Sequence, residues 1–128
     1  MSRGDELRAR ARQEIAAAAL LADGGFATQA ISRAHFATLY AAEAALLRFG
    51  ETRSKHAGVI ATFNRLVVRE HDFPVDEARL LRSLFERRNE ADYAHVAVPD
   101  EEVTRALADA RTFLAAIDAW EARQAPSE

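Results

Sequence analysis

Hydrophobic residues recur along this chain with the spacing of an α-helix, in five segments separated by polar residues, glycine and proline. Apolar positions three and four residues apart fall on one face of a helix. The alternation that would indicate a strand is confined to residues 95–98. The predicted helices cover about residues 5–22, 28–49, 55–69, 76–95 and 100–123. Because short links favour antiparallel neighbours, we expect an all-α, antiparallel up-and-down bundle of four to five helices.

The second predicted helix, residues 28–49, is apolar around most of its circumference. One stripe contains Ile31 and His35, and a second stripe beside it contains Phe36 and Tyr40. Such a helix is buried on more than one side. It lies either at the centre of the bundle or also against a partner subunit. On this stripe His35 is most simply a hydrogen-bonded core histidine.

The fourth predicted helix, residues 76–95, places three polar side chains on its apolar face. Arg88, Asp92 and His95 fall in the same arc as its leucines. Arg88 and Asp92 are four residues apart and Asp92 and His95 three apart, so each pair can interact along the helix. Unpaired, these groups would be costly to bury, so we expect them to pair or to bind a ligand.

The composition fits one globular domain, which we place at residues 1–123 with a frayed tail at 124–128. The chain has 128 residues, 49% of them hydrophobic, and no cysteine, which excludes disulfides and thiolate chemistry. No apolar run reaches the roughly 18 residues of a membrane span, and the first residues lack the apolar core of a signal peptide. We therefore expect a cytoplasmic protein without membrane contact.

Charge is unevenly distributed along the chain. The net charge is −3, but five basic residues stand against one acid between Arg48 and Arg69. A local basic patch on an acidic protein fits a small anionic ligand or one stretch of RNA. Ordinary solvated helix faces explain the same pattern equally well.

Three sequence blocks resemble the HEPN domain (higher eukaryotes and prokaryotes nucleotide-binding), specifically its small stand-alone prokaryotic members. The first is Ser32-Arg33-Ala34-His35-Phe36-Ala37, followed by the alanine-rich residues 41–47. The second is Ser54-Lys55-His56-Ala57-Gly58-Val59. The third, Arg88-Asn89-Glu90-Ala91-Asp92-Tyr93, matches an R-x-x-A-D-Y signature. The resemblance spans about residues 5–120 and implies a helical bundle.

The resemblance also implies an activity, since many HEPN proteins are similar to metal-independent ribonucleases that carry an arginine and a histidine with four to six residues between them. Arg88 and His95, with six residues between them, fit the long end of that range. An imidazole can move the protons of RNA cleavage, and a guanidinium can hold the phosphate. We therefore predict Arg88, His95 and Asp92 as catalytic residues, with Asp92 orienting one of the other two.

Two non-catalytic alternatives remain open. Arg88 and Asp92 could simply form an ion pair that organises a silent HEPN module, or the chain could be a helical dimerisation scaffold. The resemblance implies a homodimer, with two motifs across a shared cleft, and a minimal nucleotidyltransferase as antitoxin partner of a toxin-like protein.

Further contacts to RNA or nucleotide are predicted around the catalytic residues. His56 and Ser54 precede a helix and could bind a phosphate, although His56 is more often a loop contact. No histidine spacing typical of a metal site is present, so we expect no metal and no cofactor. The predicted binding residues are Asn89, Tyr93, Arg33, Ser54, Lys55 and His56.

Overall fold

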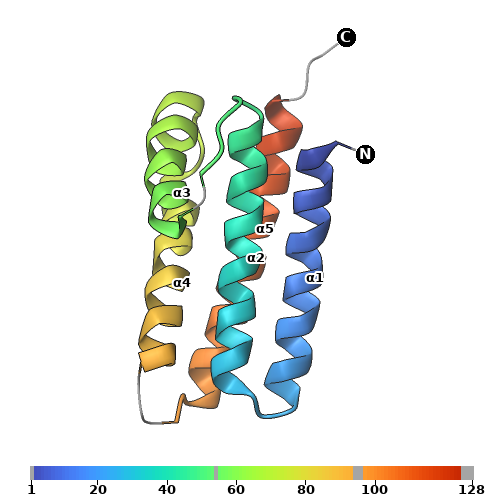
Figure 1. Cartoon of the computed structure of the whole chain (residues 1–128), viewed down its shortest axis with the longest axis vertical. Coiled ribbons are helices and arrows are strands. Elements are labelled where there is room, and N and C mark those ends of the chain that lie inside the picture. The colour runs from blue at the N-terminus through green and yellow to red at the C-terminus, as the bar shows by residue number, and fades with distance from the viewer. Residues whose placement is uncertain (1, 54, 94–96, 125–128) are drawn as a thin grey trace.

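The computed structural model describes residues 2–53, 55–93 and 97–124, and every element in these ranges is helical. Figure 1 shows long neighbouring helices running up and down beside one another. The predicted all-α antiparallel bundle is therefore confirmed. Its elements are α1 (Arg3–Asp23), α2 (Ala27–Leu47), α3 (His56–Thr62), the π-helical segment η1 (Phe63–Arg69), α4 (Val75–Tyr93) and α5 (Asp100–Gln124).

Helix α2 occupies the centre of the bundle. It packs against α1, α4 and α5, and also against α3 and η1, and Figure 1 shows α1 and α4 on its two sides. Seven of its buried residues are alanines, which let neighbouring helices approach closely. The central position accounts for the apolar character of α2 around its circumference.

The predicted third helix, residues 55–69, is wrong in one respect, because the chain is α-helical only to Thr62. From Phe63 to Arg69 it widens into the π-helix η1. Phe63 and Val67 nevertheless remain fully buried, so the apolar pattern holds while the backbone does not. The residue before α3 is Lys55, which makes no capping bond with its side chain. Ser54, one of the predicted binding residues, lies outside the described residues.

The aromatic core fixes η1 and the turn after it. Phe63 packs on Phe73 and Phe113, with ring centroids 5.1 Å and 5.7 Å away. The indole Nε1–H of Trp120 donates to the carbonyl oxygen of His71 at 2.8 Å. These contacts hold η1 and the turn after it against α5.

No described helix is long and apolar enough to cross a membrane.

Candidate functional site

Side chains from α2, α3 and α4 converge around the ring of Phe36. The guanidinium carbons of Arg33 and Arg88 lie 4.7 Å and 5.5 Å from its centroid. The imidazole of His56 meets the same ring edge to face, 5.4 Å between centroids. Cations and imidazole N–H groups are attracted to an aromatic face. These residues and His35 form what we term the arginine–histidine cluster.

The two arginines of the cluster each have one carboxylate partner. Arg33 Nη1 contacts Glu14 Oε1 of α1 at 3.2 Å. Arg88 Nε lies 3.2 Å from Asp92 Oδ2, the expected pairing along one helix. The side chain of Arg33 is 37% exposed and that of Arg88 is 27% exposed. Part of each side chain is therefore accessible to an additional anion.

Two histidines form the inner wall of the cluster. His35 is fully buried, with 0% of its surface exposed, and its Nε2 lies 3.1 Å from Nδ1 of His56. Burial lowers the pKa of His35 to about 3, and the charges of His56, Arg88 and Arg33 add to this effect. Burial, then the charge of Arg88, also lowers the pKa of His56. Both imidazoles are therefore neutral at pH 7.

Two buried polar atoms in this cluster have no hydrogen-bond partner among the described residues. They are Nδ1 of His35 and Nε of Arg88. The Arg88–Asp92 contact is short enough for an ion pair, but its geometry does not make a hydrogen bond at Nε. Buried polar groups are nearly always paired, and no other buried side-chain nitrogen or oxygen in the described ranges is left unpaired. Among the described residues, the buried side-chain atoms that lack hydrogen-bond partners are therefore all in this cluster.

The structure brings some of the predicted site residues together and corrects one expectation. Arg33 and His56 lie in the cluster with Arg88. The expected burial of Asp92 is wrong, because Asp92 is exposed at the end of α4. A helical projection gives the direction of a side chain, but it does not say whether a neighbouring helix covers that position. His95, the predicted proton carrier, lies outside the described residues.

The remaining predicted binding residues lie at the periphery. Asn89 is half-buried and Lys55 is exposed, while Tyr93 is 80% exposed at the end of α4. Sequence reasoning missed Phe36 as the platform of the cluster, having treated it as part of an apolar stripe. The spacing of three residues between Arg33 and Phe36 was the available signal, since it stacks one side chain over the other.

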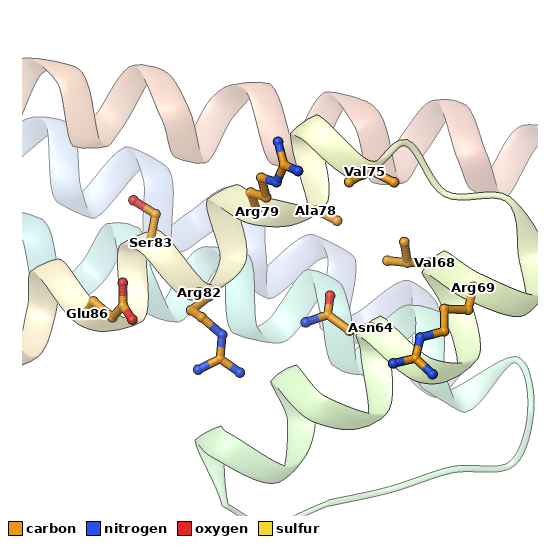
Figure 2. Close-up of a pocket in the computed structure, with 9 residues that line it drawn as sticks. All are labelled: Asn64, Val68, Arg69, Val75, Ala78, Arg79, Arg82, Ser83 and Glu86. Atoms are coloured by element: carbon orange, nitrogen blue, oxygen red, sulfur yellow. The ribbon is translucent and has the colours of Figure 1, made fainter.

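A groove of about 390 Å³ lies between η1 and α4 and shares no residue with the cluster. Its apolar floor is Val68, Val75 and Ala78 (Figure 2). Figure 2 shows Arg69 and Arg82 on the same side as Asn64, whereas Arg79 points the other way. The rest of the lining is Ser83 and Glu86.

No three histidine, aspartate or glutamate side chains gather closely enough for a metal ion within residues 2–53, 55–93 and 97–124. The polar groups of the cluster are two guanidiniums and two imidazoles, a set suited to an anion rather than to a cation.

Comparison with known proteins identifies the family. The family model for the HEPN domain matches residues 5–120, and the chain therefore belongs to the HEPN family. Among its relatives, a UPF0332 protein of Thermotoga maritima is 34% identical over 87% of this chain and 85% of its own length. A protein of Methanocaldococcus jannaschii named "Putative toxin MJ0605" is 29% identical over 81% of this chain and 78% of its own. A UPF0332 protein of Gloeobacter violaceus is also 29% identical, over 77% of this chain and 81% of its own.

Proposed function

We propose that this HEPN protein is a toxin-like, metal-independent endoribonuclease that binds the RNA backbone at the arginine–histidine cluster. The observation that carries the proposal is the convergence of Arg88, Arg33 and His56 on Phe36, with the Nε–H of Arg88 buried and unpaired. A phosphodiester oxygen is the kind of acceptor that such a donor set favours. The name of the archaeal relative supports a toxin-like role.

The cluster suits the charge that develops during RNA cleavage. The 2′-hydroxyl loses its proton and attacks phosphorus, the bond to the 5′-oxygen breaks, and that oxygen takes up a proton. Negative charge builds on the non-bridging oxygens, which Arg88 and Arg33 would stabilise. In this proposal His95 moves the proton, and Asp92 orients Arg88 through their ion pair.

Cleavage of a fluorogenic single-stranded RNA in the presence of EDTA tests the proposal. Wild-type protein is expected to cleave, and Arg88→Ala and His95→Ala are each expected to lose at least about a hundredfold in rate. Arg111→Ala, which removes an arginine from an exposed position of α5, is the matched control and keeps the wild-type rate. Absence of cleavage by the wild type, or full activity of His95→Ala, contradicts the enzymatic function.

The neutralising partners of both arginines favour a second candidate, a silent HEPN module. Glu14 and Asp92 occupy Arg33 and Arg88 as ion pairs, as purely structural pairs would. In that case Arg88→Ala lowers the free energy of unfolding without changing any activity. Since Asp92 is exposed and can be hydrated once unpaired, the loss should be below about 1 kcal/mol. Measuring stability and cleavage on the same variant separates the two functions.

We further propose that the protein acts as a homodimer and pairs with a minimal nucleotidyltransferase as its antitoxin. In one chain a single histidine, His95, would have to move both protons of the cleavage reaction, and a two-fold dimer would bring two such sets of residues together. Large exposed apolar side chains support such a contact: Leu20 and Tyr93 are 75% and 80% exposed.

A further inference from the structure

We propose that His35 is a positioning residue. Its Nε2–H holds the proton of His56 on Nε2, so that His56 offers a neutral N–H donor to an anionic oxygen in the cluster. The identity of that oxygen as part of a phosphodiester rests on the proposed function, whereas the position of the proton does not.

In the contact between the two histidines, one ring nitrogen must carry a proton and donate it, and the other must accept. His35 Nε2 and His56 Nδ1 are 3.1 Å apart, and a neutral imidazole carries a single N–H. In one arrangement His35 donates from Nε2, and the proton of His56 is on its own Nε2. In the other, His56 donates from Nδ1, and the proton of His35 is then on Nδ1.

The surroundings of His35 favour the first arrangement. Its Nδ1 is buried and has no hydrogen-bond partner among the described residues. The second arrangement would leave a buried N–H there without an acceptor, and orphaned N–H groups are rarer in proteins than under-used acceptors. The first arrangement also places both rings in the Nε2–H form, which neutral histidine side chains favour in water. The hydrogen bond and the intrinsic preference thus select the same tautomer.

This arrangement opposes protonation of His56. A proton added to its Nδ1 would face the Nε2–H of His35, so the bond would break or His35 would have to move its own proton to the unpaired Nδ1. The nearby charges act in the same direction. Arg33 of α2, which pairs with Glu14 of α1, and Arg88 of α4, which pairs with Asp92, are the charged groups around the two rings. The lowered pKa of His56 agrees with this geometry.

The arginines and His56 therefore have different roles in the cluster. Arg33 and Arg88 supply positive charge around Phe36, and His56 supplies one directed donor that does not change with pH in the physiological range. Because His56 Nδ1 is occupied by His35, only its Nε2 edge is available to a ligand. His56 therefore binds as a hydrogen-bond donor and does not serve as a base.

Imidazole nitrogen NMR of the full chain, labelled with nitrogen-15 at histidine, reads the tautomer directly. We expect His56 and His35 both to be neutral and to carry their protons on Nε2 at pH 7, since the pKa of each is lowered. His71 is an internal contrast, because its Nδ1 lies 2.9 Å from the carbonyl oxygen of Leu66 and must donate. A His56 proton on Nδ1, or a charged His56 at pH 7 with His35 in place, overturns the proposal.

Two variants test the role of His35 beyond packing. His35→Phe keeps an aromatic ring and removes the donor, so the pKa of His56 should rise and its tautomers should mix. His35→Gln can donate an amide N–H to His56 Nδ1 and should restore the wild-type tautomer. A change in packing alone would affect stability without moving the proton of His56.

Binding of a fluorescein-labelled oligouridylate gives the functional readout. Between pH 7.5 and pH 5.5 at fixed salt, wild type and His35→Gln should gain less affinity than His35→Phe. That variant should bind roughly fivefold to tenfold more tightly at the lower pH, as His56 gains charge. A flat profile for His35→Phe contradicts the positioning role. Absence of RNA binding with the His56 proton on Nε2 contradicts the proposed function and the phosphodiester ligand, but not the placement of the proton.

Discussion

The buried imidazole of His35 makes folding sensitive to acid. Its pKa is about 3 in the folded chain against about 6.5 when unfolded. The unfolded state therefore binds one more proton between these values, and stability falls as the pH drops from about 6.5. The contribution of His35 is fully present above its unfolded pKa and is lost below it, by up to about 1.4 kcal/mol per pH unit.

Urea unfolding at a series of pH values checks this dependence. His35→Phe should show a flatter loss of stability below about pH 6.5 than the wild type, because a phenyl ring takes up no proton on unfolding. Thr38→Val is the matched control. It removes a buried hydroxyl that donates to the carbonyl oxygen of His35 at 2.8 Å and leaves the titrating group in place, so its slope should equal that of the wild type. Equal slopes for all three proteins would contradict the prediction.

At the scale of single residues, the sequence predicted the direction of a side chain on its helix better than its burial. The pairing of Arg88 with Asp92 follows from four-residue spacing and is confirmed, as is the burial of His35. The contact of His35 with His56 was not predictable, since it depends on where α3 begins relative to α2. The exposure of Asp92 was missed for the same reason: burial depends on which helix lies opposite.

The groove between η1 and α4 provides a test at the scale of elements. Arg82 and Arg88 both lie on α4, about 9 Å apart along its axis and about 120° apart around it, so RNA bound at the cluster would have to wrap around α4 to reach the groove. Arg69 lies on the same side of the groove as Arg82 (Figure 2). Neither arginine forms an ion pair within the part of the chain that the structure describes.

Removing one phosphate contact changes the salt dependence of binding by a known amount. Arg82→Gln and Arg69→Gln should each reduce the slope of log affinity against log salt by about 0.7 for a single strand. Arg111→Gln, at an exposed position of α5, is the control and should leave the slope unchanged. An equal reduction in all three variants would indicate a general charge effect and no path along α4.

At the element scale, helix positions were predictable and helix type was not. Glycine, proline and the apolar period placed all the long helices within a few residues of their observed ends. The π-helical turn in η1 escaped detection, because Phe63 and Val67 are four residues apart and read as one stripe of an ordinary helix. Phe63 packs there against Phe73 and Phe113, which lie outside the segment and so were not part of its local sequence pattern.

Among the described residues, three of the four large exposed apolar side chains lie at one end of the bundle. Leu20 near the end of α1, Phe26 in the following turn and Tyr93 at the end of α4 are all more than half exposed. Figure 1 shows that the α1–α2 turn and the end of α4 lie at the same end of the bundle. Exposed apolar groups gathered in this way are typical of an interface, and this end adjoins the region of α4 that bears Arg88 and Asp92.

Sedimentation velocity of charge-insertion variants tests whether this end forms the proposed dimer. The wild type should sediment as a dimer, and the double variant Leu20→Glu with Phe26→Glu as a monomer, because carboxylates would be desolvated in the contact. Val75→Glu is the matched control: Val75 is also an exposed apolar residue, but it begins α4 at the opposite end of the bundle. If Val75→Glu dissociates the dimer and the double variant does not, the interface lies at the groove end. A wild type that sediments as a monomer would contradict the dimer and would require the cluster of a single chain to bind and cleave RNA alone. Full cleavage by a monomeric variant would likewise show that the dimer is not needed for activity.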